Sequence, residues 1–154
     1  MDIPRIFTIS ESEHRIHNPF TPEKYATLGR VLRMKPGTRI LDLGSGSGEM
    51  LCTWARDHGI NGTGIDMSQL FTAQAKQRAE ELGVSERVHF IHNDAAGYVT
   101  DEKCDVAACV GATWIAGGVA GSVGLLAKSL KPGGMILIGE PYWRQVPATE
   151  EIAQ

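Results

Sequence analysis

Apolar positions follow two different rhythms along the chain, and the two rhythms alternate. Short apolar runs, with the length of buried strands, are followed by longer segments in which apolar side chains recur at helical spacing. The run Asp105–Val110 is apolar at almost every position, which is typical of a strand covered by helices on both faces. The expected strands are 39–43, 62–66, 87–92, 105–110 and 135–138.

The helical segments begin and end at residues suited to helix termini. Thr21 is a capping residue and Pro22 suits the first helical position, whereas Lys35-Pro36-Gly37 ends that helix. Gly59 and Gly83 close the next two helices. The alternation of strands and helices predicts an α/β protein with a doubly wound parallel sheet. The expected helices run from Thr21 or Pro22 to about residue 34, from Glu49 to His58, from Ser68 to about Leu82, and from about Val119 to Leu130.

A glycine-rich loop follows the first strand in the stretch RILDLGSGSGEM, with Gly44, Gly46 and Gly48 two residues apart. A dinucleotide fingerprint, G-x-G-x-x-G, would need its third glycine where Glu49 stands. A pyrophosphate would sit at the start of the following helix, where Glu49 and the nearby Asp42 would repel it. The same two acids would attract a ligand with a cationic centre and an ammonium group.

Two further acids end the next two strands. Asp66 lies at the end of GTGID, where a carboxylate can accept two hydrogen bonds from a ribose diol. A role as helix cap is the alternative for Asp66, although Ser68 is better placed to cap. Asp94 can accept from an exocyclic amine, while the backbone N–H of Ala95 donates to a ring nitrogen. Together these groups predict an adenosine that carries a cationic, amino-acid-like tail.

These motifs resemble those of class I S-adenosylmethionine-dependent methyltransferases, in particular small bacterial methyltransferase-domain proteins akin to the ubiquinone/menaquinone methylases. ILDLGSGSGE matches their first motif, GTGIDMS their ribose-binding acid, HNDAA their adenine-binding position, and LKPGGMILIGE their turn into the fifth strand. The resemblance covers about Ile16 to Trp143. HRIHNPFT and GATWIAGG also resemble an uncharacterised bacterial member of this group.

The resemblance implies S-adenosyl-L-methionine as the cofactor and gives each matching residue a role. The three glycines let the backbone approach the methionine part, and Asp42 lies near its amino group. Asp66 holds the ribose, Asp94 and Ala95 meet the adenine, and the segment 110–112 lines the side that faces the sulfonium. The predicted cofactor-binding residues are Asp42, Gly44, Ser45, Gly46, Gly48, Asp66, Met67, Asp94, Ala95, Val110 and Gly111.

For such a core we expect the strand order 3-2-1-4-5, with the donor at the switch point between strands 1 and 4. Residues 1–20 form an N-terminal segment that can fold over the donor site, and residues 21–154 form the core. The last two strands of the family are absent, and PATEEIAQ reads as the start of a helix, so we expect a C-terminally truncated chain. The fifth strand would then be an open edge that can pair with a second copy in a homo-dimer.

The predicted function is S-adenosylmethionine-dependent methyl transfer to a small-molecule acceptor. No catalytic residue is assigned; His17, Glu140 and Tyr142 are candidate bases if the acceptor must lose a proton early. Trp114, Tyr142 and Trp143 follow the fourth and fifth strands and either wall an acceptor pocket or pack in the core. The alternatives are a binding protein without turnover and a NAD(P)-dependent oxidoreductase, which Glu49 argues against.

Composition and charge exclude some classes of binding partner. The 154 residues carry a net charge of −3 and no run of Lys and Arg, so neither a nucleic acid nor an anionic membrane is expected as a partner. Cys52, Cys104 and Cys109 lack the spacings of zinc sites, so no metal is expected, and the last two are best explained as buried apolar residues. The absence of a signal-like N-terminus predicts a reduced, cytoplasmic protein.

Overall fold

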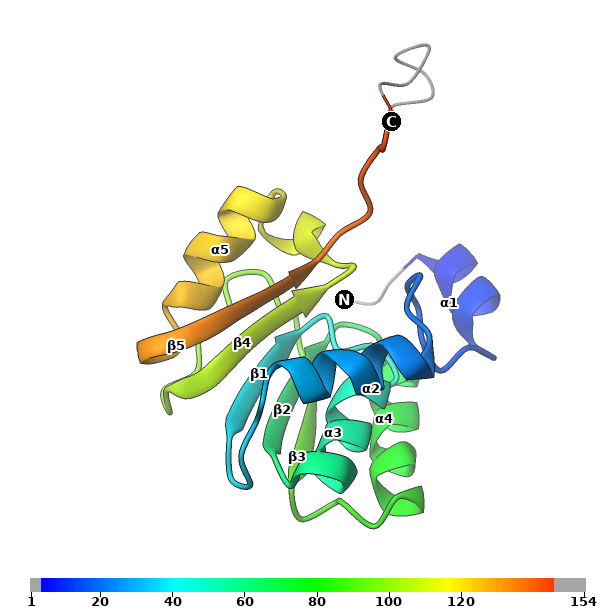
Figure 1. Ribbon diagram of the computed structural model, residues 1–154. Helices are drawn as coiled ribbons and strands as arrows, with labels where there is room; N and C mark the ends of the chain where they lie inside the picture. The colour runs from blue at the N-terminus through cyan, green and yellow to red at the C-terminus, as the bar shows by residue number, and fades with distance from the viewer. Residues whose placement is uncertain (1–3, 146–154) are drawn as a thin grey trace.

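The computed structural model describes residues 4–145, which form an α/β fold built around one sheet (Figure 1). The elements in chain order are α1 (Arg5–Glu11), α2 (Pro22–Val31), β1 (Arg39–Leu43), α3 (Glu49–His58), β2 (Asn61–Asp66), α4 (Gln69–Glu81), β3 (Val88–His92), β4 (Cys104–Val110), the 3-10 helix η1 (Thr113–Ala116), α5 (Val119–Ala127) and β5 (Leu130–Gly139).

The five strands form one parallel sheet in the order β3-β2-β1-β4-β5, which confirms the predicted topology. In register, Asp42 of β1 lies opposite Gly64 of β2 on one side and Ala108 of β4 on the other. Because all strands run in the same direction, the loops after β1, β2, β3 and β4 meet at one edge of the sheet.

The core has two halves, one on each face of the sheet, because side chains alternate along each strand. Helices α2, α3 and α4 pack on one face, where Trp54 and Leu51 are fully buried against Ile40 of β1. Helix α5 lies on the opposite face, where Leu126 packs with Leu41 of β1 (Figure 1). Strand β1 therefore contributes side chains to both halves of the core.

The helix termini follow the predicted capping chemistry. The Thr21 side chain accepts from the backbone N–H of Lys24, with Pro22 at the first helical position. Ser68 accepts from the backbone N–H of Phe71, which confirms Ser68 as the cap of α4. These local bonds satisfy backbone donors that have no partner inside their helices.

Several boundaries differ from the sequence prediction. The first predicted helix ends at Val31, a few residues early, and both α1 and η1 were not predicted. Strand β5 begins at Leu130, so the Lys131–Gly134 turn lies within the strand rather than before it. Between the pairs Cys104↔Leu130 and Val106↔Met135 the register shifts, because the turn residues bulge out of the ladder.

Strand β5 forms one edge of the sheet within residues 4–145. Pairing of this edge with a second copy stays a prediction. The predicted helix start in PATEEIAQ lies outside the described residues. No helix in the described part of the chain is long and apolar enough to cross a membrane.

Candidate functional site

A cavity of about 560 Å³ opens where the loops after β1, β2, β3 and β4 meet. All of the predicted cofactor-binding residues except Gly48 line this cavity. Those that do are Asp42, Gly44, Ser45, Gly46, Asp66, Met67, Asp94, Ala95, Val110 and Gly111.

The glycine loop needs glycine for two separate reasons. Gly44 and Gly48 both adopt positive φ, 78° and 75°, a conformation that is costly for other residues. A Cβ on Gly44 would come within 2.6 Å of Ala112, and one on Gly48 within 2.6 Å of Phe90. Gly48 therefore serves close packing at the start of α3 rather than the cavity, whereas Gly44 brings the loop backbone to the cavity wall.

Asp66 holds the glycine loop in place. Its Oδ2 accepts from the backbone N–H of Gly46 at 2.8 Å, and its Oδ1 accepts from the backbone N–H of Ser68 at 2.8 Å. The side chain is buried yet lines the cavity. Asp66 is thus a structural residue of the loop in addition to its predicted contact with a ribose, because each carboxylate oxygen can accept more than one hydrogen bond.

Asp42 is the buried acid of the cavity that lacks a partner. Its side chain is 4% exposed, and its Oδ1 makes no hydrogen bond to any described residue. Burial, followed by the nearby Asp66 carboxylate, raises the pKa of Asp42 to about 7. Ser45 Oγ is likewise buried without a hydrogen-bond partner within residues 4–145. Two unsatisfied polar atoms in one cavity fit a ligand that supplies a cation and a hydrogen-bonding group.

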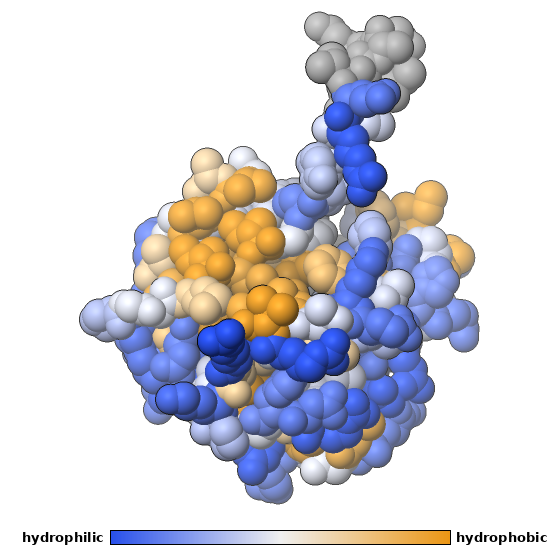
Figure 2. Space-filling view, in the orientation of Figure 1, coloured by the Kyte–Doolittle hydropathy of each residue, from blue (hydrophilic) through white to orange (hydrophobic). Residues whose placement is uncertain are grey.

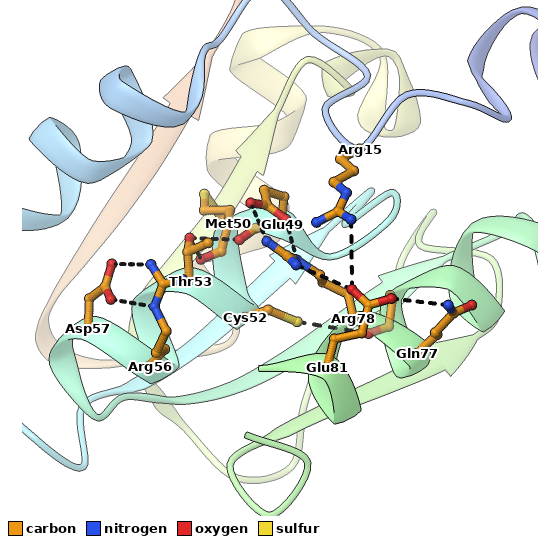
Figure 3. A network of polar contacts seen from close by, with 11 residues as sticks. Arg15, Glu49, Met50, Cys52, Thr53, Arg56, Asp57, Gln77, Arg78 and Glu81 are labelled. Atoms are coloured by element: carbon orange, nitrogen blue, oxygen red, sulfur yellow. Dashed lines mark hydrogen bonds and ion pairs between the residues drawn. The ribbon is translucent and has the colours of Figure 1, made fainter. Parts of the chain in front are cut away.

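Glu49, in contrast, is neutralised by Arg78 of α4 (Figure 3). Arg78 donates to both oxygens of Glu49, Nε to Oε2 at 2.8 Å and Nη2 to Oε1 at 3.1 Å. Arg78 also donates to Glu81, which Arg15 approaches at 3.8 Å. The expectation that Glu49 attracts a cationic ligand stays a prediction: Glu49 lines the cavity, and its two oxygens also accept from a guanidinium.

The predicted adenine-binding residues lie in the loop after β3. Ala95 is buried, whereas Asp94 is exposed, and its Oδ1 accepts from the backbone N–H of Ala96 at 2.8 Å. This turn presents the Asp94 carboxylate at the rim of the cavity. Contact of this pair with an adenine stays a prediction.

Residues 12–20, here called the N-terminal strap, lie against the glycine loop. His17 Nε2 lies 3.1 Å from Ser47 Oγ, and the His17 ring is 4.1 Å from that of Phe71. Ser47 also donates to Gln74 at 2.7 Å, and Gln74 donates to the carbonyl of Ser12 at 2.8 Å. The strap is therefore fastened to both α4 and the loop that carries the glycines.

The end of the strap closes a second wall of the cavity. Asn18 Nδ2 donates to the Tyr25 hydroxyl at 2.9 Å and lies 3.5 Å from the Val110 carbonyl. A Cβ on Gly111 would come within 3.1 Å of the Asn18 Cβ, so Gly111 allows the strap to approach β4. The pattern of the sequence did not mark Asn18, whose role depends on contacts with residues far along the chain.

Apolar side chains from three elements line part of the cavity. Phe7 of α1, Ile16 of the strap, and Trp114 and Ile115 of η1 line it, and Trp114 is 65% exposed. Figure 2 shows apolar side chains gathered over α5 and a smaller group at α1. The prediction that Trp114 walls a pocket is supported by this position.

The remaining candidates lie away from the cavity. Tyr142 and Trp143 are exposed beyond β5 and are not among the described residues that line it. Glu140 Oε1 accepts from the backbone N–H of Thr113 at 3.0 Å and supports η1. Cys104 and Cys109 are free and buried, as predicted for apolar packing residues. Of the candidate bases, only His17 lines the cavity.

The chain resembles known proteins over its whole length. A family model described as a methyltransferase domain matches residues 40–134. The chain is 91% identical over 154 residues to protein YjhP of Escherichia coli (strain K12), all of this chain matching 62% of that protein.

Two solved structures with the same fold are S-adenosylmethionine-dependent methyltransferases in complex with S-adenosyl-L-homocysteine. The one from Geobacter sulfurreducens is 80% identical, with a TM-score of 0.97 over 99% of this chain and 61% of that chain. The one from Thiobacillus denitrificans is 76% identical, with a TM-score of 0.97 over 99% of this chain and 62% of that chain. The chain spans about three fifths of the length of these relatives. Given this match and the Rossmann-like sheet, the chain belongs to the methyltransferase domain family.

Proposed function

We propose that this chain binds S-adenosyl-L-methionine in the cavity at the strand ends and serves methyl transfer to a small, apolar acceptor. The observation that carries the proposal is the buried Asp42 carboxylate, which lines the cavity without a partner among the described residues. A sulfonium compound with an ammonium group supplies the missing positive charge. The complexes of the two similar methyltransferases with S-adenosyl-L-homocysteine support the same ligand class.

Each part of the donor has residues suited to it. The ammonium group would face Asp42, and the methionine part would lie on the backbone of the loop from Gly44 to Gly46. Asp66 would accept from the ribose hydroxyls with the lone pairs that its two backbone donors leave free. Asp94 and Ala95 would meet the adenine at the rim. A dinucleotide is disfavoured, because its pyrophosphate would meet the acidic side chains of Asp42 and Asp66, which offer it no positive charge.

The donor supplies an activated methyl group, so the protein's task is to align an acceptor and to exclude water. The strap and η1 both line the cavity, and Ile16, Trp114 and Ile115 give it apolar surface beside the polar side chains of the strap. Alignment of two reactants in one orientation is worth about 7–11 kcal/mol. We therefore propose that residues 4–20 fold over the donor and hold an apolar acceptor against it, with Phe7, Ile16 and Trp114 as contacts.

Titration calorimetry tests donor binding. S-adenosyl-L-homocysteine and S-adenosyl-L-methionine should bind, whereas NAD should not. Gly44→Ala should abolish binding, because its Cβ would meet Ala112 at 2.6 Å. Gly124→Ala is the matched control, since a Cβ there meets nothing within 4 Å. Binding of NAD alone would overturn the proposal.

Methyl transfer is tested separately from binding. The protein with S-adenosyl-L-methionine and a panel of small aromatic and quinone-like acceptors should release S-adenosyl-L-homocysteine, which is measured by mass spectrometry. A panel of equally sized polar acceptors serves as the control. Donor binding without release of S-adenosyl-L-homocysteine for any acceptor would favour the alternative of a binding protein without turnover.

A further inference from the structure

Asp42 combines three features that no other acid of the cavity has together. It is almost completely buried, its Oδ1 has no hydrogen-bond partner among the described residues, and it faces a second acid, Asp66, across the cavity wall. Asp66 has backbone N–H donors on both oxygens, and Glu49 has a guanidinium. A buried carboxylate that lacks both kinds of partner is costly to ionise.

The groups around Asp42 offer it little positive charge. Burial raises the pKa of the Tyr25 hydroxyl and of the Cys109 thiol to about 12, so both stay neutral near pH 7. Arg15 and His17 line the same cavity from the N-terminal strap, but Arg15 faces Glu81 and His17 faces Ser47. The titratable and charged groups that interact with Asp42 are Tyr25 of α2, Asp66 of β2 and Cys109 of β4. Those that line the same cavity are Glu49 of α3, Asp94 of the loop after β3, and Glu11, Arg15 and His17 of the N-terminal segment.

We propose that Asp42 exchanges a proton for the cationic tail of the donor, holding the proton in the ligand-free protein and releasing it when the ammonium group enters. The inference rests on the proposed donor site. The balance is simple: the neutral acid and the ligand cation become a carboxylate–ammonium pair, and one proton passes to the buffer. Asp42 is thereby a binding residue whose charge appears only with the ligand.

The raised pKa of about 7 sets the pH range of this exchange. Below that value most of the free protein carries the proton, so binding must release it and weakens as the pH falls. Above it the carboxylate is already ionised and binding depends little on pH. With the pair fully ionised in the complex, affinity should rise about fifteenfold between pH 5.5 and pH 7.0.

Calorimetry in two buffers counts the protons. At pH 6.0, S-adenosyl-L-homocysteine is titrated in phosphate and in imidazole, whose ionisation enthalpies differ, and the difference in binding heat gives the protons released. The wild-type protein should release about 0.9 proton per ligand, and Asp42→Asn should release less than about 0.2. 5′-Deoxy-5′-methylthioadenosine, which has the nucleoside but no ammonium group, should also release less than about 0.2.

Asp101→Asn is the matched control, because it makes the same chemical change at an exposed acid that does not line the cavity. It should keep the proton release and the pH slope of the wild-type protein. Release of no proton by the wild-type protein, equal release by Asp42→Asn, or loss of release in Asp101→Asn would overturn the proposal. These outcomes all require that S-adenosyl-L-homocysteine binds; failure to bind at any pH would instead overturn the proposed function.

Discussion

Two buried acids border the glycine loop, and their surroundings differ in one respect. Glu49 at the start of α3 has side-chain exposure of 9% and holds Arg78, itself 17% exposed, through two hydrogen bonds. Asp42 at the end of β1 is 4% exposed and has no such partner among the described residues. Both acids line the cavity, but Glu49 also joins α3 to α4 through its counter-ion, whereas the Oδ1 of Asp42 has no partner among the described residues.

The difference teaches that burial alone does not mark a binding residue. Both acids stand at suggestive positions in the sequence, on either side of Gly44 and Gly48. What separates them is the charge supplied by a distant part of the chain, because a buried acid needs a counter-charge from the protein or from a ligand. Four substitutions test this difference between the acids.

The largest effect is expected where the counter-ion of Glu49 is removed. Arg78→Met leaves a buried carboxylate without its guanidinium and should lower the free energy of unfolding by about 3–5 kcal/mol, measured by urea denaturation. The control is Arg56→Met, whose pair with Asp57 is exposed by 47% and 39%, and which should cost less than about 1 kcal/mol. Equal losses in the two variants would show that Glu49 does not depend on its partner.

Removal of the Asp42 charge should raise the free energy of unfolding, whereas Arg78→Met lowers it. The folded pKa of about 7 exceeds the ordinary value of 3.8, so the folded protein binds the proton more tightly and loses stability as the pH rises between these values. The stability advantage of Asp42→Asn over the wild-type protein should grow by about 2–3 kcal/mol from pH 5 to pH 8. Urea denaturation at both pH values without ligand measures it, and a pH-independent difference would contradict the raised pKa.

Asp66 lies between the two cases, because its partners are backbone N–H groups. Asp66→Ala should weaken binding of S-adenosyl-L-homocysteine by about 1.5–3 kcal/mol and should also lower the melting temperature, since Gly46 and Ser68 lose an acceptor. Asp94→Ala is the control, whose exposed side chain should affect binding with little change in melting. If Asp66→Ala melts at the same temperature as the wild-type protein, the loop holds its shape without the carboxylate.

The smallest effect is expected at the contact between strap and loop. Ser47→Ala removes the hydroxyl that links His17 to Gln74. It should lower the free energy of unfolding by about 0.5–1.5 kcal/mol. Hydrogen exchange should become faster in residues 12–18 while the sheet is unchanged. Ser10→Ala on the exposed face of α1 is the control and should change neither the free energy of unfolding nor the exchange rates. Unchanged exchange in Ser47→Ala would show that other contacts hold the strap.

Much of the site was predictable because its residues follow strands at fixed spacing. Asp42, Gly44, Asp66 and Ala95 line the cavity as expected, since the carboxyl ends of parallel strands meet at one edge. Asn18 was not predicted, because it reaches the cavity through Tyr25 and Val110 and not through a motif of its own.

Residue patterns along the chain were enough to predict the order of the five strands and of helices α2 to α5, the capping at Thr21 and Ser68, and the glycine loop. These features depend on local spacing, backbone conformation and hydrogen bonds between near neighbours. Only the tertiary structure decided which acid is neutralised, because Arg78 lies 29 residues from Glu49 and meets it only when α4 packs beside α3. Tertiary packing also brings His17 to Ser47, 30 residues away, and leaves the Oδ1 of Asp42 without a hydrogen-bond partner among the described residues.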